Sequence, residues 1–491
     1  MTETTAGGVY RHELNSRSVG FPGVLMQSVA QISPTLGIFY TIAFITGQTG
    51  ITAPLTYVVA FILCLTLAVP LAGLAREMPS AGGYYTYVSR ALGPDTGLMT
   101  GWLYGVSVAL VPCALAAFTG AVLHDELYAE WGFGLAWWVY AVAILALCYW
   151  VAFRGIVISA RFMMTMGVAE IVIGLSLAVT GLVHPGPGGL NLSGFNPANI
   201  HSQSGFFLAV ILSIFAFTGF ESAAAIGEES REPSRLIPAA IVGSVLMLGV
   251  FYVLTAWGLQ IGWGTDNLHA LASSPTAPAF VLAQHLWGIG WVVVLVALLN
   301  SGIGVCIACT TSSTRTLYGM ARTGALPAFF SAVHPRHKTP YKAVMVQSAA
   351  ALLLCLGLGG LYGPTNLFNI FGIAGTYAYI LIYGLGNVAA WHYFRTIRRQ
   401  NFNVLYHVVF PLIGTAALIY IGYESLVPVP AYPVWIGPII TAAYVVTGLA
   451  ALLWARRPGH AGWRARSAEL PDTAGGPDHA PGSSASVQPA S

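Results

Sequence analysis

Long apolar runs are the feature that most constrains how this chain can fold. They recur twelve times, and each is close to the ~20 residues that a helix needs to cross the hydrocarbon core of a bilayer. The runs cover residues 22–48, 51–75, 97–123, 134–153, 159–183, 205–227, 238–263, 284–314, 341–362, 366–390, 404–422 and 432–454. Backbone inside hydrocarbon must satisfy its own hydrogen bonds, so the runs predict helices. We therefore predict an all-α integral membrane protein with about twelve transmembrane helices.

The composition supports one membrane domain, which we expect at 21–455. Of the 491 residues, 56% are hydrophobic and 8% are charged, whereas soluble domains carry roughly 25% charged residues. The preceding segment, 1–20, is polar, and the first apolar run is too long for a signal-peptide core, so we expect a retained first helix. The segment 456–491 is rich in Pro, Gly, Ser and Ala. It predicts a disordered cytoplasmic tail.

The Lys and Arg residues fall on one side of the predicted membrane. Taken in chain order, alternate connections with the span ends that flank them, and the two terminal segments, contain all 20 of them. They are Arg11, Arg17, Arg76, Arg90, Arg154, Arg161, Arg231, Arg235, Arg315, Arg322, Arg336, Lys338, Lys342, Arg395, Arg398, Arg399, Arg456, Arg457, Arg464 and Arg466. The opposite connections, such as 184–203 and 264–283, contain none. The positive-inside rule then predicts that both termini are cytoplasmic and that the protein lies in the cell (inner) membrane.

The six cysteines all lie in apolar runs, which argues against a disulfide framework. Cys306 and Cys309 form a CxxC pair on a predicted helix, but no second ligand pair accompanies them. We therefore interpret them as packing residues and expect no metal and no cofactor.

Two of the apolar runs are interrupted near their midpoints. The first contains Ser33, Pro34 and Gly37, and the sixth contains Gly219 followed by Glu221. A single Pro or Gly kink is common in membrane helices, but paired breaks in two halves of a chain indicate a binding site. Unwinding leaves N–H and carbonyl groups without partners, and it brings helix-dipole ends to the gap. A zwitterion suits this arrangement, since its carboxylate takes the N–H groups and its ammonium the carbonyls.

Three strings resemble the amino acid/polyamine/organocation (APC) permeases. They are REMPSAGGYYTYVSRALGPDTGLMTGW at 76–102, FAFTGFESAAAIGEESREPSRLIPAAI at 215–241 and STRTLYGMARTGALPAFF at 313–330. The resemblance implies the APC/LeuT-like fold, a five-plus-five inverted repeat followed by two C-terminal helices. The first repeat would be 22–183, the second 205–390, and the extra helices 404–454.

The resemblance also implies substrate-binding residues at the two breaks. Ser33, Thr35, Leu36 and Gly37 would contact a substrate carboxylate. Phe215, Ala216, Thr218 and Gly219 would lie beside its amine, with Phe215 where the family often has an occluding aromatic. The family's first-span motif GxGIF reads PTLGIF here, at 34–39. This departure weakens the expectation of carboxylate recognition and favours a decarboxylated amine.

Two acids, Glu170 and Glu221, fall inside predicted spans, where a carboxylate is costly and is a functional candidate by default. Glu170 lies near the place where several family members carry a lysine. It could be a protonatable coupling group, a partner for a cationic substrate or a structural acceptor. Under the first hypothesis, Glu170→Gln abolishes or decouples uptake, and transport that keeps its full pH response would contradict it.

Hydroxyl groups cluster near the end of the eighth span. Ser312 and Ser313 could help to hold a sodium ion, because a hard cation prefers oxygen ligands. The alternative is that these hydroxyls bond to their own helix, which Ser and Thr commonly do.

Taken together, the sequence predicts a secondary active transporter for an amino acid or related amine, working by alternating access and coupled to protons. An amino acid/polyamine exchanger and a sodium-coupled symporter remain alternatives, and a channel or receptor is an alternative of a different class. No HExxH, GxSxG or P-loop motif lies in a span, so we do not expect an enzyme. The expected partners are the small-molecule substrate, a proton and the lipid bilayer, with no nucleic acid.

Overall fold

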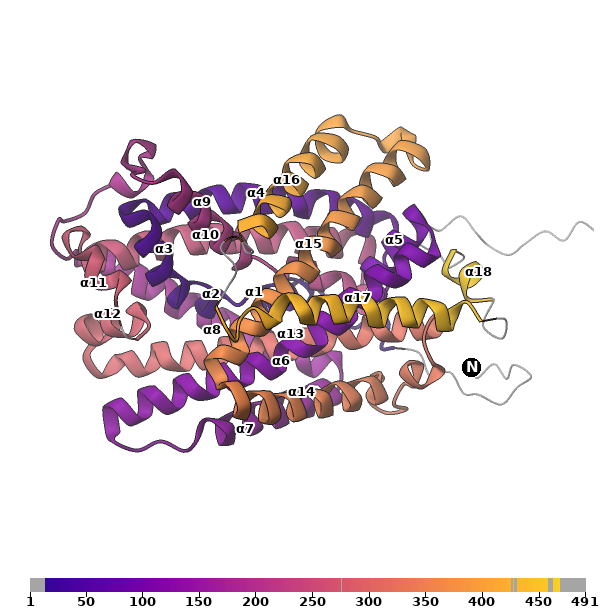
Figure 1. The fold of residues 1–491 in the computed structure, drawn as a ribbon, viewed down its shortest axis with the longest axis horizontal. Coiled ribbons are helices and arrows are strands. Elements are labelled where there is room, and N and C mark those ends of the chain that lie inside the picture. Colours follow the sequence, from indigo (N-terminus) through magenta and orange to yellow (C-terminus); the bar gives the residue numbers. More distant parts are fainter. Residues whose placement is uncertain (1–13, 275, 425–426, 428–430, 458–461, 469–491) are drawn as a thin grey trace, which may run out of the picture.

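The computed structural model is a bundle of helices that run roughly side by side along its long axis (Figure 1). It describes residues 14–274, 276–424, 427, 431–457 and 462–468. The predicted all-α membrane fold is confirmed, and among the described residues there is no β-strand beyond one isolated bridge.

Twelve spans follow one another at the positions of the twelve apolar runs. In order they are α1 (Phe21–Ile32) with α2 (Pro34–Phe39) and α3 (Thr41–Thr49), α4 (Ala53–Glu77), α6 (Pro94–Trp131), α7 (Trp137–Phe153), α8 (Ile156–Val183), α9 (Gln203–Phe215) with η4 (Phe220–Glu229), α10 (Pro233–Trp263), α13 (Trp291–Thr323), α14 (Tyr341–Tyr362), α15 (Pro364–Thr396), α16 (Phe410–Glu424) and α17 (Ile436–Ala455). Ten helices in the described part of the chain are long and apolar enough to cross a membrane. The two other spans are the first, which is broken, and α7, which has 17 residues.

Short helices connect the spans. They are η1 (Gly50–Thr52), α5 (Tyr84–Leu92), η2 (Ser193–Phe195), η3 (Pro197–Asn199), η5 (Thr265–Asn267), α11 (Leu268–Ala272), α12 (Pro278–Trp287), η6 (Gly288–Gly290), η7 (Ala328–Ser331), η8 (Arg399–Asn401), η9 (Leu405–Val409) and α18 (Trp463–Ala468).

The first and sixth spans cross at the centre of the bundle. The broken segment α1 packs against η4 and against α8, α10 and α13, so the two breaks face each other inside a ring of continuous helices. Equivalent spans of the two predicted repeats also pack together, because α4 contacts α10 and α6 contacts α13.

Small residues permit the closest helix crossings. A Cβ added at Gly258 of α10 would lie 2.4 Å from the carbonyl oxygen of Ala178 on α8. In return, a Cβ at Gly181 would lie 2.3 Å from the carbonyl oxygen of Gly258. Helices in a membrane associate largely through such close contacts between small residues.

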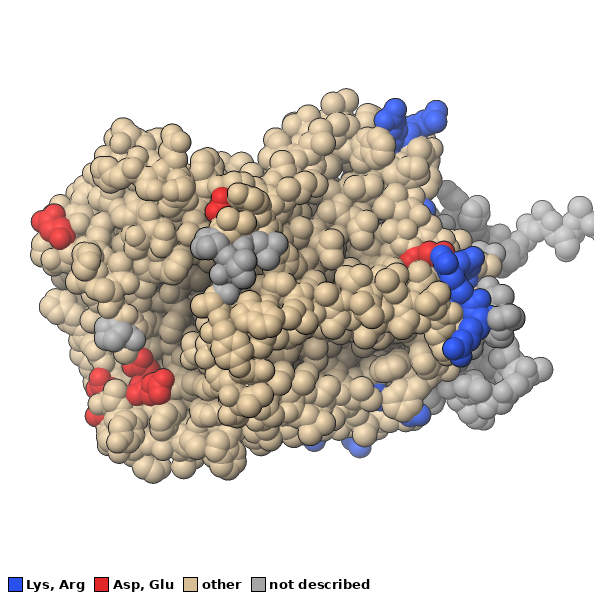
Figure 2. All heavy atoms as spheres, in the orientation of Figure 1, with Lys and Arg blue, Asp and Glu red and all other residues tan. Residues whose placement is uncertain are grey.

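Basic side chains gather at one end of the bundle. Figure 2 shows the Lys and Arg side chains toward the end where α18 lies, and none at the opposite end. We call these the basic end and the opposite end. Helix α6 runs away from the basic end and α15 runs toward it. The Lys and Arg residues therefore gather on the side of the spans where the sequence predicted them.

Part of the C-terminal tail differs from the prediction of disorder. Residues 463–468 form α18, and the indole of Trp463 is fully buried in a cluster with Tyr85, Leu98 and Met320. Trp463 also donates through Nε1 to the carbonyl of Ala455 at 2.8 Å. One large apolar side chain thus docks a segment that is otherwise polar. The rest of the tail, 469–491, lies outside the described residues, as does 1–13 of the N-terminal segment.

Candidate transport site

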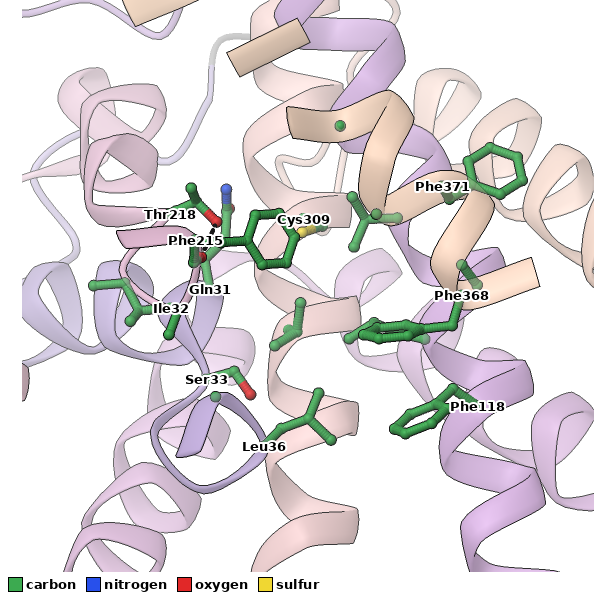
Figure 3. Close-up of a pocket in the computed structure, with 18 of the residues that line it drawn as sticks. Gln31, Ile32, Ser33, Leu36, Phe118, Phe215, Thr218, Cys309, Phe368 and Phe371 are labelled. Carbon is green, nitrogen blue, oxygen red and sulfur yellow. Dashed lines mark hydrogen bonds between the residues drawn. The ribbon is translucent and has the colours of Figure 1, made fainter. Parts of the chain in front are cut away.

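A mainly apolar cavity lies between the two breaks and three neighbouring spans, with an empty volume of about 940 Å³ including its opening. Figure 3 shows the ring of Phe215 pointing into the middle of this space. The cavity is lined by Gln31, Ile32, Ser33, Leu36, Gly37, Tyr40, Thr41, Val111, Ala114, Leu115, Phe118, Phe215, Ala216, Thr218, Val305, Cys309, Phe368, Phe371, Gly372, Gly375 and Tyr379. None of these described lining residues is Lys, Arg or His. The site therefore suits a molecule with an apolar body and offers it no fixed cation.

The first span breaks at Ser33, whose φ of 69° places it in the left-handed region. Such a backbone is uncommon for a residue with a side chain, and Pro34 then starts the next helix without an N–H group. The Ser33 hydroxyl contacts the hydroxyl of Ser301 on α13 at 2.6 Å. That contact fixes the side chain of the residue on which the chain turns.

Glu170, on α8, is the principal partner of this break. Its Oε1 accepts hydrogen bonds from the backbone N–H of Thr35 at 2.7 Å and from the Thr35 hydroxyl at 2.9 Å. Asn300 on α13 donates through Nδ2 to Oε2 at 3.3 Å, while its own Oδ1 has no partner in the described structure. Glu170 is 3% exposed. The carboxylate therefore joins the first, fifth and eighth spans where the first is unwound.

The sixth span breaks at Gly219, whose φ of 114° is one that side-chain-bearing residues rarely adopt. The Gly219 N–H donates to Oε2 of Glu221 at 3.1 Å, so the acid two residues further on caps its own break. Tyr383 on α15 donates its hydroxyl to the same oxygen at 2.6 Å. Gln31 donates through Nε2 to Oε1 at 3.3 Å. Gln31 lines the cavity and Glu221 does not, so the amide of Gln31 lies between the cavity and Glu221.

One tyrosine contacts both breaks. The hydroxyl of Tyr252 on α10 lies 3.0 Å from the carbonyl oxygen of Ala216 and 3.3 Å from that of Ser33. Tyr252 is fully buried, and Phe217 packs edge-on against it with ring centroids 5.0 Å apart. The two unwound segments are thus held together by a hydroxyl that can donate to only one of them at a time.

Most residues that the sequence predicted for substrate binding line this cavity. Those that do are Ser33, Leu36, Gly37, Phe215, Ala216 and Thr218. Thr35 and Gly219 do not line it, because Thr35 faces Glu170 and Gly219 lies against the backbone of Gln31. The site residues that were not predicted are Gln31, Tyr252, Asn300, Ser301 and Tyr379. The signal for Asn300 and Ser301 was available, since they are the first polar pair in the apolar run of α13.

The predicted hydroxyl cluster lies apart from Glu170. Ser312 donates to Oε1 of Gln31 at 2.9 Å, and Ser313 donates to the carbonyl of Cys309 in its own helix at 2.7 Å. Sodium binding by these two residues stays a prediction. Cys309 lines the cavity and Cys306 is buried behind it, and no cluster of possible metal ligands occurs in the part of the chain that the structure describes.

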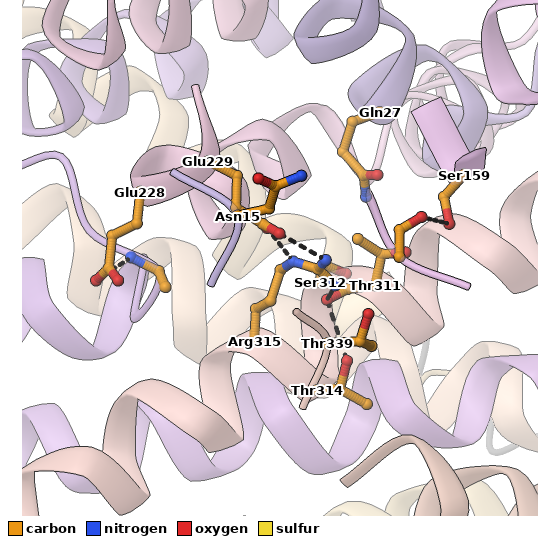
Figure 4. A network of polar contacts seen from close by, with 12 residues as sticks. Asn15, Gln27, Ser159, Glu228, Glu229, Thr311, Ser312, Thr314, Arg315 and Thr339 are labelled. Atoms are coloured by element: carbon orange, nitrogen blue, oxygen red, sulfur yellow. Dashed lines mark hydrogen bonds and ion pairs between the residues drawn. The ribbon is translucent and has the colours of Figure 1, made fainter. Parts of the chain in front are cut away.

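A buried ion pair joins the sixth and eighth spans on the basic side of the breaks (Figure 4). Arg315 and Glu229 have side chains that are 2% and 0% exposed, and their groups meet through two hydrogen bonds. The carbonyl of Glu229 also accepts the N–H groups of Ser18 and Val19 at 2.9 and 3.0 Å. Breaking a buried ion pair by removing one partner is strongly destabilising. The pair therefore ties the sixth and eighth spans together on the basic side of the breaks.

Comparison with known proteins bears on the same residues. A family model described as "Amino acid permease" matches residues 23–457, which include both breaks. The chain belongs to the amino acid permease family. The family consists of transporters and not enzymes, so this permease is a multi-pass membrane transporter.

Three relatives indicate the range of the family. The permease is 27% identical over 339 residues to a low-affinity putrescine importer of Escherichia coli, covering 67% of this chain and 72% of the importer. It is 28% identical to a branched-chain amino acid permease of Bacillus subtilis, covering 69% and 74%. It is 27% identical to a serine/threonine exchanger of the same organism, covering 60% and 66%.

Proposed function

We propose that this permease imports an amino acid or a related amine across the cytoplasmic membrane by alternating access, driven by an inward proton gradient. The observation that carries the proposal is the pair of facing breaks around one cavity, with a buried carboxylate at each. The relatives act on amino acids or on putrescine, which fits a site of this size and chemistry.

Glu170 is the candidate coupling group. As a carboxylate it accepts three hydrogen bonds, from Thr35 twice and from Asn300. As a carboxylic acid it would need an acceptor for its own O–H, and the Oδ1 of Asn300, which has no partner in the described structure, would supply one once the amide of Asn300 turns over. Both protonation states can thus be satisfied without refolding the site. A change in the proton on Glu170 acts directly on the unwound segment, because the group bonds to Thr35.

Alternating access needs the two ends of the bundle to open in turn. The cavity includes Phe118 and Phe368, which lie toward the opposite end, while Arg315 and Glu229 tie the sixth and eighth spans together on the basic side. Separation of this ion pair, with closure of the Phe residues over the cavity, would give the other state. We place the basic end in the cytoplasm because of the positive-inside rule, and we retain the division into repeats at 22–183 and 205–390.

The test is uptake of labelled substrates by the purified permease in proteoliposomes. We expect saturable accumulation that requires an inward proton gradient and does not respond to a sodium gradient. Uptake only into vesicles preloaded with substrate would favour the exchanger, which the likeness to the serine/threonine exchanger makes the second candidate. Non-saturable flux without counterflow would favour a channel and contradict the proposal.

A further inference from the structure

The N–H groups at the break of the first span are all occupied. Unwound segments at a helix N-terminus usually bind anions, because their N–H groups have no partner in the helix. Here the N–H of Thr35 donates to Glu170, that of Leu36 to the hydroxyl of Ser301 at 3.3 Å, and that of Gly37 to the carbonyl of Ser33 at 2.9 Å. Pro34 has none to offer. A substrate carboxylate would therefore find its usual donors already bonded, and the strongest of them bonded to another carboxylate.

At the break of the sixth span, too, protein groups occupy N–H groups. The N–H of Gly219 donates to Glu221, and that of Ala223 donates to the hydroxyl of Ser28 at 3.2 Å. Each break thus has a protein carboxylate, Glu170 from α8 or Glu221 from the sixth span itself, at the positive end of the following helix. The helix ends that remain for a ligand to contact are the C-terminal ends that precede the two breaks.

Those remaining ends are negative. Helix α1 ends at Ile32 and α9 ends at Phe215, and both C-termini point at the gap. Near the cavity, the carbonyls of Ser33 and Ala216 share the single hydroxyl proton of Tyr252. Carbonyl oxygens, two carboxylates and the absence of Lys, Arg or His among the described lining residues make this an environment for a cation.

We propose that the transported molecule is an amine cation with an apolar body and no α-carboxylate, and that Glu170, which lies behind the first break and outside the cavity, takes up the N–H of Thr35 that would otherwise be open to an amino acid's carboxylate. The inference rests on the proposed transport function and narrows its substrate. The ammonium group binds the carbonyls of the two breaks, with Glu221 behind Gln31 adding negative charge. The aromatic and aliphatic lining holds the hydrocarbon part, and the ring of Phe215 can cover the ammonium group.

Charge repulsion sets the expected selectivity. Glu170 would repel a substrate carboxylate at the first break, and two like charges about 5 Å apart discriminate on the order of 100-fold at an effective dielectric constant of about 20. The amine of a matched pair is therefore expected to bind on the order of 100-fold more tightly than the amino acid that carries the extra carboxylate.

The test uses four pairs that differ only by that carboxylate: isoamylamine and leucine, phenethylamine and phenylalanine, putrescine and ornithine, and cadaverine and lysine. Each is measured by direct binding to the purified permease and by counterflow, neither of which needs proton coupling. We expect at least one amine to bind and exchange and its amino acid to fail. An amino acid that binds as well as its amine overturns the inference but leaves the transport function standing. No binding or counterflow by any member of the panel contradicts both.

Variants at Glu170 separate its proposed role from a merely structural one. Glu170→Ala frees the N–H of Thr35 and removes the repelling charge, so the ratio of amine to amino acid affinity should fall at least tenfold. Glu170→Gln keeps the side-chain volume and should shift the ratio in the same direction if the alanine variant does not fold. Glu126→Gln is the matched control, because Glu126 is also a buried acid but lies outside the cavity on α6. An unchanged ratio in both Glu170 variants overturns the role assigned to Glu170.

Discussion

The two broken spans satisfy their exposed N–H groups in different ways. Each exposes the positive end of a helix in the middle of the membrane, where an unpaired N–H group costs several kcal/mol. In the sixth span the capping acid, Glu221, belongs to the broken segment itself. In the first span the acid, Glu170, comes from α8 and also bonds Asn300 on α13. The cap of the sixth break therefore lies within the broken segment, although Glu221 also bonds Gln31 and Tyr383 on other spans, whereas the cap of the first break comes from another span.

This difference indicates which of the two breaks links protonation to conformational change. Movement of α8 or α13 relative to the first span must stretch the contacts of Glu170, while Glu221 travels with its own break. We therefore expect substitutions at the first break to alter coupling and those at the sixth to alter binding and stability.

The largest effect is expected for Glu170→Gln. The amide cannot take up or release a proton, so gradient-driven uptake should fall on the order of 100-fold, the range in which loss of a proton-transfer group acts. Counterflow, which needs no net proton movement, should survive. The two assays are run on the same proteoliposomes. Loss of both activities in a folded variant would mean that Glu170 serves structure and not coupling, and the contrast between the breaks would disappear.

Glu221→Gln should weaken binding while leaving the proton response in place. The substitution keeps an oxygen for Tyr383 and Gly219 but removes the negative charge behind Gln31. The amine cation loses the attraction of a full negative charge in a site of low dielectric constant, so its affinity should fall at least tenfold. The measurement is the binding constant together with the pH profile of uptake. A lost pH response with unchanged affinity would reverse the roles assigned to the two acids.

The sequence predicts the spans and their breaks better than it predicts the contacts between them. The apolar runs locate all twelve spans, because the bilayer fixes the length of each helix. Pro34 and Gly219 locate the breaks, since both disrupt a helix by their own covalent structure. The contacts of Glu170 could not be found in this way, because Asn300 stands out as a polar residue in an apolar run but nothing in the sequence tells which neighbouring span it meets. Trp463 was missed for a related reason, since one aromatic residue in a polar tail has no periodicity.

A smaller effect is expected from a matched pair of backbone substitutions. Gly219→Ala places a Cβ 2.8 Å from the backbone carbonyl carbon of Gln31 in a conformation with φ of 114°, which should cost about 1–3 kcal/mol of stability. Ser33→Gly relieves a left-handed φ but removes the contact with Ser301, so its effects should nearly cancel. Thermal unfolding in detergent measures both. Equal destabilisation by the two substitutions would show that the backbone conformation is constrained to a similar degree at both breaks.

The smallest effect is expected where the breaks meet, at Tyr252. Tyr252→Phe removes a hydroxyl bonded to Ala216 at 3.0 Å, which should cost about 1 kcal/mol, or roughly fivefold in binding. The same hydroxyl lies 2.5 Å from where a Cβ on Gly37 would stand, so Gly37→Ala alone should clash with it. In the double variant the next ring atom is 3.2 Å away, and the clash is largely relieved. Binding by the double variant should therefore exceed that by Gly37→Ala alone. Additive losses instead would mean that Tyr252 does not constrain the first break, and that the two breaks move independently.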